Sequence, residues 1–171
     1  MIYTKTSETV HDLTGDRESD AGIDVYVDSM WNNGKPYIIR MGEQVNIPSG
    51  IKVKLSNKDQ MLLFENKSGV SRKKGLVRLA CVIDYSYRGI CHINLAKVCR
   101  GTEDIRVRRR GILGWLGFKE WAAVINPGEK IIQGIIVQTS SEDAIQVSNK
   151  AYEQGPKTKR GEGGFGSTGV K

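Results

Sequence analysis

Short apolar runs separated by turn residues recur along the chain, and few segments repeat apolar side chains with the period of a helix. Residues 51–55, Ile-Lys-Val-Lys-Leu, alternate strictly between apolar and polar, which predicts a strand with one buried face. The other strand-like runs are residues 37–39, 61–64, 76–83, 90–95 and 130–138. Asn, Pro, Ser and Gly mark the turns between them, at 32–34, 48–50, 56–59 and 126–128. The pattern predicts an all-β sandwich, barrel or jelly roll with one short helix within residues 68–75.

The composition changes after Tyr152. Residues 153–159 have the composition of an extended linker, and residues 160–169 are rich in glycine. Such a segment cannot bury a core, so we expect a flexible C-terminal arm. Its arginine, phenylalanine and hydroxyl groups lie among glycines that let a backbone approach an anion, although an idle solvated end is the alternative. We therefore predict a β domain over residues 1–152 and a mobile arm over residues 153–171.

The charge of the chain favours a polyanionic partner. Its 26 Lys and Arg residues against 19 Asp and Glu give a formal net charge of +7. The basic residues cluster in segments 66–78, 100–121 and 150–171. Aromatic residues make up only 7%, and we find no helix-turn-helix, zinc-finger or aromatic RNA-binding signature. A phosphate-bearing small molecule explains the clusters equally well, and we predict no nucleic-acid partner.

The cysteines and the apolar runs indicate the compartment. Cys81, Cys91 and Cys99 lack CxxC spacing and have only His11 and His92 as further soft ligands, which argues against disulfides and a zinc site. The first residues show no apolar signal core, and every apolar run is too short to span a membrane. We expect a soluble intracellular protein with reduced thiols and no membrane partner.

Asp84 is the first candidate for chemistry. Residues 81–95 predict a hairpin, and Asp84 ends its first arm directly after an apolar run. A carboxylate held there can accept a proton from water, although an Asp at a strand end more often caps a turn. Tyr87 either offers a flat face to a ring or packs as an ordinary aromatic side chain.

A second candidate joins a strand to the predicted helix. Residues 66–75 bring backbone amides, hydroxyls and ammonium groups together, which suits a phosphate, although an exposed basic turn is the alternative. The GxxxxGK[ST] spacing of a Walker loop is absent. The glycine-rich tail is no dinucleotide fingerprint either, because no βαβ unit follows it.

Taken in order, these segments resemble the five motifs of the homotrimeric deoxyuridine triphosphate nucleotidohydrolases (dUTPases). The matching residues are 20–25, 67–70, 82–84 with 87–89, 128–133 and 160–169. The resemblance implies a jelly roll of the β-clip type and a homotrimer with three active sites at subunit interfaces. It also implies hydrolysis of dUTP to dUMP and pyrophosphate.

The resemblance assigns roles to individual residues. Asp84 would orient and deprotonate the water that attacks the α-phosphorus, and Tyr87 would pack under the deoxyribose. The backbone around Cys81 and His92 would pair with the uracil edge. The residues that would hold the phosphate chain are Lys67, Ser68, Gly69 and Gln133.

The resemblance also assigns roles to the tail and to a metal. The tail of one subunit would close over a site formed by the others, through Arg160, Phe165, Gly166, Ser167 and Thr168. Phe165 would stack on uracil, and Arg160 would reach the γ-phosphate. Mg²⁺ would be held mainly by the substrate phosphates and water, with Asp24 in its outer shell at most.

Four departures from the family pattern stand in or near the motifs. Ser86 replaces a second Asp, Lys67 replaces an Arg, Cys81 replaces a Gly, and Arg78 stands where some members have an Asn near the base. Lys67 changes a bidentate fork into a point charge. Since none of the four removes the proposed base, the sugar platform or the tail, we expect an active enzyme.

Residues 100–120 are an apparent insertion before the fourth motif. The basic run 106–110 precedes the apolar run 112–118, and we expect the segment to form its own hairpin. Its bulky side chains either pack within the trimer or form a docking patch, as insertions at this place in some bacteriophage members suggest. The alternative function is therefore a nucleotide-gated binding protein that contacts a protein partner through residues 100–120. A deaminase of dCTP on a similar fold fits the Asp84 segment and the tail less well.

Overall fold

The computed structural model describes residues 1–15, 18–140 and 144–156. The chain divides into two units, residues 1–140 and 141–171. In the second unit a short helix, α3 (Asn149–Glu153), begins at Ser148, whose hydroxyl accepts a hydrogen bond from the backbone of Ala151.

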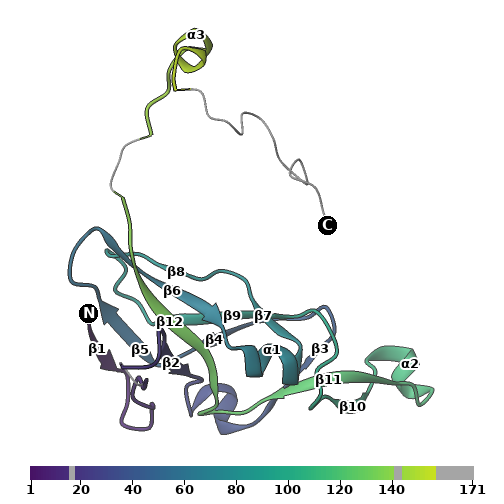
Figure 1. The fold of residues 1–171 in the computed structure, drawn as a ribbon. Coiled ribbons are helices and arrows are strands. Elements are labelled where there is room, and N and C mark those ends of the chain that lie inside the picture. Colours follow the sequence, from purple (N-terminus) through teal and green to yellow (C-terminus); the bar gives the residue numbers. More distant parts are fainter. Residues whose placement is uncertain (16–17, 141–143, 157–171) are drawn as a thin grey trace. The chain divides into compact units, whose positions relative to one another are not determined.

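The described part of the first unit is a β structure whose strands all pair antiparallel (Figure 1). The all-β jelly roll predicted from the sequence is confirmed. The strands are β1 (Ile2–Lys5), β2 (Ile23–Tyr26), β3 (Tyr37–Arg40), β4 (Gln44–Pro48), β5 (Ile51–Lys54), β6 (Gln60–Asn66), β7 (Leu76–Arg78), β8 (Val82–Ile83), β9 (His92–Lys97), β10 (Ile105–Arg108), β11 (Lys119–Ile125) and β12 (Lys130–Gln138). Their sheets have the orders β1-β5, β10-β11-β3, β2-β12-β6-β8 and β4-β9-β7.

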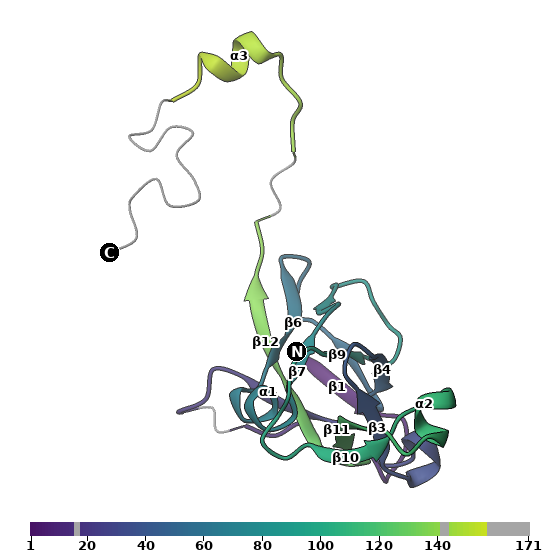
Figure 2. The same ribbon diagram turned by 90° about the vertical axis from the view of Figure 1, so that its right-hand side faces the viewer.

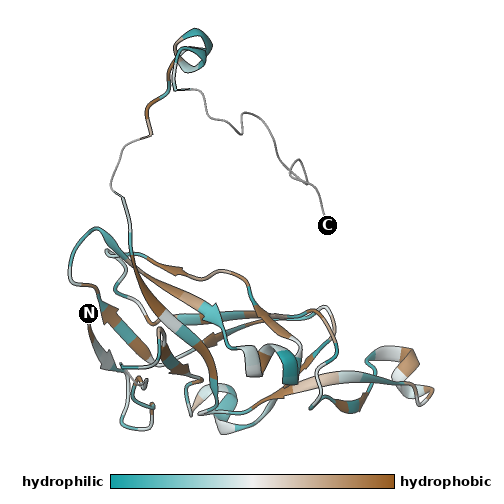
Figure 3. Ribbon diagram, viewed as in Figure 1, coloured by the Kyte–Doolittle hydropathy of each residue, from teal (hydrophilic) through white to brown (hydrophobic). Residues whose placement is uncertain are grey.

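The core follows from the alternation of side chains along these strands. In β5 the burial alternates residue by residue, so that Ile51 and Val53 point inward and the two lysines point to solvent. Each fully buried side chain of this size stabilises the fold by about 1.5–3 kcal/mol. The largest of them are Phe64, Ile39, Ile47, Leu76, Ile93, Leu95, Ile125, Ile131 and Ile132. Figure 3 shows the apolar stretches along the strands. None of the helices in the described parts is long and apolar enough to span a membrane.

The predicted helix is present as α1 (Ser68–Lys74), and it ends at Gly75 in the left-handed conformation. The turn predicted at 32–34 is present within a 3-10 segment, η1 (Trp31–Gly34), where Asn32 and Asn33 have positive φ. Two five-residue helices, α2 (Gly111–Trp115) and α3, were not predicted. Segments this short cannot display a helical repeat of apolar side chains, so no signal marked them.

Two predictions near Asp84 are wrong. The expected strand 76–83 is interrupted, because β7 ends at Arg78 and β8 begins at Val82. The expected hairpin within residues 81–95 is also not formed as a pair, since β8 pairs with β6 while β9 pairs with β4 and β7. The chain crosses between sheets at Cys81, whose carbonyl accepts a hydrogen bond from Phe64 of β6.

The hairpin predicted for the insertion is confirmed. β10 pairs with β11 from Ile105 opposite Ala122 to Arg108 opposite Lys119, and α2 lies at the end of the pair (Figure 2). β11 continues past the hairpin and pairs with β3. One strand therefore belongs both to the insertion and to the body of the domain.

Candidate active site

Asp24 lies at the centre of a first group of predicted site residues. Its carboxylate forms ion pairs with Lys67, just before α1, and with Lys130 at the start of β12, the latter at 2.6 Å. Gln133 lies opposite Asp24 in the β12–β2 ladder and donates to the carbonyl of Asn66 at 3.3 Å. Segments from the first, second and fourth predicted motifs thus meet, and we call Asp24, Lys67, Lys130 and Gln133 the Asp24 cluster.

The electrostatics of the Asp24 cluster favour an ionised Asp24. Burial acts to raise the pKa of its carboxyl, but the hydrogen bonds from Lys130 and Lys67 outweigh burial, and the pKa lies below its ordinary value. The same hydrogen bond raises the pKa of Lys130. Two ammonium groups against one carboxylate leave a local positive charge beside Ser68 and Gly69, which are both exposed. Such a place attracts an anion.

Asp84 belongs to a second group, which we call the Asp84 pocket. It is a cavity of about 280 Å³. The residues that line it are Asn46, Ala80, Cys81, Val82, Ile83, Asp84, Tyr87, His92 and Asn94. Four residues predicted to act together, Cys81, Asp84, Tyr87 and His92, are therefore brought together although the predicted hairpin pairing is wrong.

Hydrogen bonds within the loop orient the side chains of the Asp84 pocket. The Tyr87 amide donates to the carbonyl of Asp84 at 3.1 Å, which closes a tight turn. The Tyr87 hydroxyl donates to the carbonyl of Ile90 at 2.9 Å, and Nδ1 of His92 lies 2.8 Å from the same carbonyl. Because its hydroxyl is tied to the backbone, the Tyr87 ring is fixed at the cavity wall.

Arg78 fixes the side chain of Cys81. Its guanidinium forms two hydrogen bonds with the carboxylate of Glu65, at 2.9 and 2.5 Å, and lies 2.9 Å from Sγ of Cys81. These hydrogen bonds are the main reason that the pKa of the Glu65 carboxyl is lowered. Arg78 does not line the Asp84 pocket. The charge of Arg78 is therefore paired with Glu65 outside this cavity.

The two groups lie apart in one chain. Asp84 follows Ile83, which pairs with Leu62 of β6, whereas the Asp24 cluster contacts Asn66 at the end of the same strand. Four residue steps along a strand correspond to roughly 13 Å. The Asp24 cluster and the Asp84 pocket are therefore different regions of the subunit.

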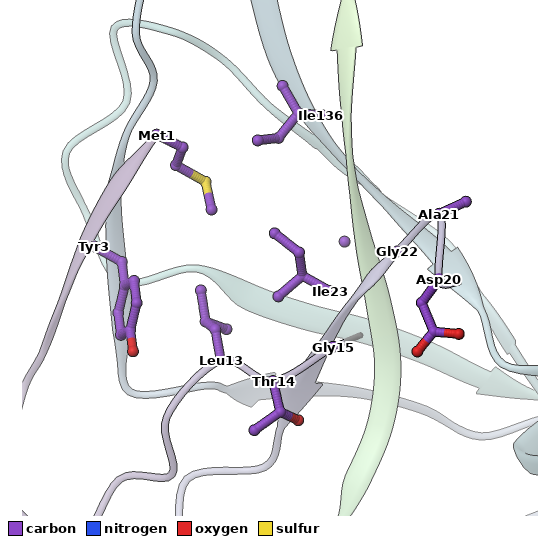
Figure 4. A pocket seen from close by; sticks show the side chains of 11 residues that line it. Met1, Tyr3, Leu13, Thr14, Gly15, Asp20, Ala21, Gly22, Ile23 and Ile136 are labelled. Carbon is purple, nitrogen blue, oxygen red and sulfur yellow. The ribbon is translucent and has the colours of Figure 1, made fainter. Parts of the chain in front are cut away.

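A larger cavity of about 300 Å³ lies beside the first motif (Figure 4). Asp20, Ala21 and Gly22 form one side, and Met1, Leu13 and Ile136 point into it. None of the side chains assigned a role from the resemblance lines this cavity. Size alone therefore does not make it the candidate site.

No protein-family model matches the chain. It is 30% identical over 134 residues to the deoxyuridine 5'-triphosphate nucleotidohydrolase of Neisseria meningitidis serogroup C, covering 77% of this chain and 73% of the relative. The chain belongs to the dUTPase family. The enzyme of the same name from Hahella chejuensis is also 30% identical, over 139 residues that cover 80% of this chain and 75% of the relative.

Solved dUTPase structures share the fold. The dUTPase of Staphylococcus bacteriophage 80alpha, as a point mutant with dUpNHpp, superposes with a TM-score of 0.75 and covers 99% of this chain and 98% of that one, at 22% identity. The dUTPase of phage phi11 of S. aureus, described for its species-specific insert, gives a TM-score of 0.67 at 21% identity and covers 86% of this chain and 96% of that one. A point mutant of the phi11 enzyme is described for the coordination of a structural Mg(II) ion.

Asp24 does not offer a free carboxylate to a metal. Both of its oxygens face ammonium groups, one of Lys67 and one of Lys130. Among the described residues, no group of three or more His, Cys, Asp or Glu side chains could hold a metal ion. This donor set suits a hydrated Mg²⁺ that the protein contacts through water and the substrate, because Mg²⁺ sheds its hydration shell reluctantly.

Asn46 and Asn94 line the Asp84 pocket but were not predicted as site residues. They lie opposite each other in the β4–β9 ladder. In β9, Asn94 shares a face with His92, because the alternate residues Ile93 and Leu95 are buried. That alternation was visible in the sequence and is the signal that would have found Asn94. The five tail residues with predicted roles lie outside the described residues.

The Asp24 cluster makes stability depend on pH. The folded-state pKa of Asp24 is lowered, so its stabilisation is present above the unfolded-state pKa and is lost as the pH falls through the folded-state value. We expect Asp24→Asn to melt at a lower temperature than the parent at neutral pH, and this gap to close below about pH 4. Thermal melts across the acid range measure it.

The control is Asp12→Asn, which breaks an ion pair between the exposed Asp12 and the partly exposed Lys5, while the amide oxygen can still accept from the Tyr3 hydroxyl. Such a pair contributes little, so its melting temperature should stay near that of the parent at every pH. A gap for Asp24→Asn that is the same at neutral and acid pH would contradict the assignment.

Proposed function

We propose that the chain is a dUTP diphosphatase that hydrolyses dUTP to dUMP and pyrophosphate. Membership of the dUTPase family supports the reaction. The observation that carries the residue assignment is the Asp84 pocket, where a carboxylate and a fixed tyrosine ring line one cavity. We infer a cytoplasmic location, in the host cytoplasm if the chain is viral, because the substrate is a free nucleotide.

In this proposal Asp84 is the general base. Its carboxylate is exposed at the cavity, where it takes a proton from the water that attacks the α-phosphorus. The ring of Tyr87 lies against the deoxyribose, where a ribose 2'-hydroxyl has no room. Main-chain groups around Cys81 and His92 read the uracil edge, and the amides of Asn46 and Asn94 supply further hydrogen-bonding groups at the same wall.

The Asp24 cluster holds the phosphate chain. Lys67 is already oriented by Asp24, and the exposed Ser68 and Gly69 follow it at the start of α1. Gln133 adds an amide to the same place. A Mg²⁺ ion held by the phosphates and water would supply neutralising charge there, and Asp24 would contact it through water at most.

The separation of the two groups supports a site shared between subunits. Within one chain, roughly 13 Å along β6 separates the strand positions beside Asp84 from those beside the Asp24 cluster, so a second subunit is needed to place the two groups face to face in this proposal. In a homotrimer, the Asp84 pocket of one subunit faces the Asp24 cluster of another. The tail of a third closes the site through Arg160, Phe165, Gly166, Ser167 and Thr168, which keeps bulk water away from the triphosphate.

The substrate is tested with purified protein and Mg²⁺. We expect pyrophosphate release from dUTP to exceed that from dCTP, dTTP and UTP by about 100-fold or more, because the pocket is read by fixed hydrogen-bonding groups and a sugar platform. Ammonia release from dCTP is measured in parallel. Equal rates on all four nucleotides would overturn the proposed selectivity.

The base is tested by Asp84→Asn. Turnover of dUTP should fall by about 10²- to 10⁴-fold while dUpNHpp binding stays close to that of the parent, since the amide keeps the shape but cannot take the proton. Single-turnover rates and titration calorimetry measure the two effects. Asp12→Asn is the matched control for an exposed aspartate outside the site, and it should turn over normally. Parental turnover by Asp84→Asn would exclude this base.

A second function is favoured by the end of the insertion hairpin. The exposed fractions of Ile112, Trp115 and Phe118 are 73%, 80% and 55%, and no acid occurs between Ile105 and Lys119. Monomer surfaces rarely expose apolar side chains in such a cluster. We propose that this hairpin tip, residues 111–118, contacts a protein partner in a nucleotide-dependent way.

The hairpin tip is tested by the double variant W115S/F118S. We expect it to hydrolyse dUTP and to melt as the parent does, because both side chains are mostly exposed. In a pull-down from the source cell, we expect the parent to retain a protein partner, and to retain it more strongly with dUpNHpp than without. W115S/F118S should not retain this protein. Met30→Ser removes an equally exposed apolar side chain elsewhere and should retain it. Identical retention by parent and W115S/F118S counts against the proposal.

A further inference from the structure

The C-terminal end of α1 is capped almost entirely by one other segment. The last carbonyls of a helix have no partner within the helix. The carbonyl of Ser71 accepts from Gly75 at 2.8 Å, which is a local cap. The next three accept from residues 97–103: Arg72 from the amide of Thr102 at 3.2 Å, Lys73 from the amide of Glu103 at 2.8 Å, and Lys74 from the ammonium of Lys97 at 2.7 Å. We call residues 97–104 the insertion root.

Two glycines let the insertion root lie directly against the helix end. A Cβ at Gly101 would come within 2.1 Å of the carbonyl oxygen of Lys73. A Cβ at Gly75 would come within 1.9 Å of the carbonyl oxygen of Cys99, and Gly75 also has a positive φ of 62°. Backbone therefore contacts backbone, and α1 and the insertion root leave no room to slide past each other.

A buried ion pair fixes the insertion root. The side chains of Lys97 and Asp104 are 0% and 1% exposed. The ammonium of Lys97 donates to Lys74, to the carbonyl of Cys99 at 3.0 Å and to Oδ1 of Asp104 at 2.9 Å, so its three donors are all used. Oδ2 of Asp104 lies 2.8 Å from the same ammonium and has no hydrogen bond among the described residues. Neither charge can stay buried without the other.

The other end of α1 holds the proposed phosphate residues. α1 has only seven residues, and Lys67 and Ser68 stand at its beginning. The side chain of Lys74, at its end, also binds Glu129, one residue after the start of the fourth motif, at 2.5 Å. A change at the capped end of so short a helix is not absorbed along its length.

We propose that Lys97 and Asp104 are positioning residues for the triphosphate. Resting on the proposed function, this inference states that the buried pair caps α1 and so holds Lys67 and Ser68 where the phosphate chain binds. Neither residue touches the substrate. The pair acts on the phosphate end of the nucleotide and not on the Asp84 pocket, which it does not contact.

The test is the double variant Lys97→Met with Asp104→Leu. Replacing both charges with apolar side chains of similar size leaves no unpaired charge in the interior and keeps the net charge unchanged, while the carbonyls of Lys74 and Cys99 lose the ammonium donor. We expect the dissociation constant for tripolyphosphate with Mg²⁺ and the KM for dUTP to rise about tenfold, the size of the one charge-assisted hydrogen bond that the end of α1 loses at Lys74. The dissociation constant for deoxyuridine, which has no phosphate, should stay within about twofold.

The control uses the exposed ion pair that joins the same two segments. Lys73 and Glu103 lie 2.9 Å apart with side chains 57% and 52% exposed. The variant Lys73→Met with Glu103→Leu makes the same chemical change outside the interior, and the backbone hydrogen bond of Glu103 remains. Its tripolyphosphate and deoxyuridine affinities should match those of the parent.

A milder variant keeps the proposal testable if Lys97→Met with Asp104→Leu does not fold. Lys97→Gln with Asp104→Asn removes both buried charges together and keeps an amide donor for the carbonyl of Lys74, so it should raise the dissociation constant for tripolyphosphate only roughly threefold. Unchanged tripolyphosphate binding in the folded variants, or an equal loss for tripolyphosphate and deoxyuridine, overturns the positioning role. Absence of dUTP hydrolysis by the parent defeats the proposed function instead, and the ratio of variant to parent in tripolyphosphate binding still decides this inference.

Discussion

The ladder that β12 forms with β2 on one side and β6 on the other is the constraint on which the candidate site depends. Gln133 lies opposite Asp24 in one direction and opposite Glu65 in the other. This register brings the fourth motif between the first motif and the strand that leads into the second. A slip of one residue would turn Gln133 into the core and send Ile132 to the surface, so the burial of Ile132 holds the register.

Charge is arranged differently at the two ends of α1. At its beginning, Asp24 is shared by two lysines and leaves a positive excess that is open to solvent and to an anion. At its end, Lys97 and Asp104 are fully buried and neutralise each other. The ion pairs of Asp24 suit ligand binding, because a ligand can exchange with a partner that is open to solvent. The buried pair of Lys97 and Asp104 suits a fixed geometry. The short helix α1 therefore connects the solvent-accessible Asp24 cluster with the buried pair of Lys97 and Asp104.

Sequence patterns predicted the position of a strand where its own alternation sets its burial. They failed where pairing with another strand sets the structure. The alternation of Ile51 to Lys54 survives in the structure because one face of that strand is buried, and the apolar run of β12 survives because β12 is paired on both sides and buries Ile131 and Ile132 in succession. The run 76–83 was equally apolar, yet its middle is exposed, with Leu79 39% exposed, because β8 finds its partner in β6. The motifs identified residues that the structure gathers into the Asp24 cluster and the Asp84 pocket. No local sequence pattern showed which residue belongs to which group. Lys97 had no signal either, since a lysine is expected to reach solvent.

Two tryptophans, Trp121 in β11 and Trp115 in α2, separate the structural part of the β10–β11 hairpin from its exposed part. Trp121 lies under the guanidinium of Arg100 at 3.7 Å and of Arg106 at 5.0 Å, so the hairpin packs its own base within the chain. Trp115, 80% exposed, has no comparable cover within the described subunit. Packing within the chain therefore accounts for Trp121 and not for Trp115. β10 begins directly after Asp104, so a partner that binds the tip also engages the element whose root caps α1.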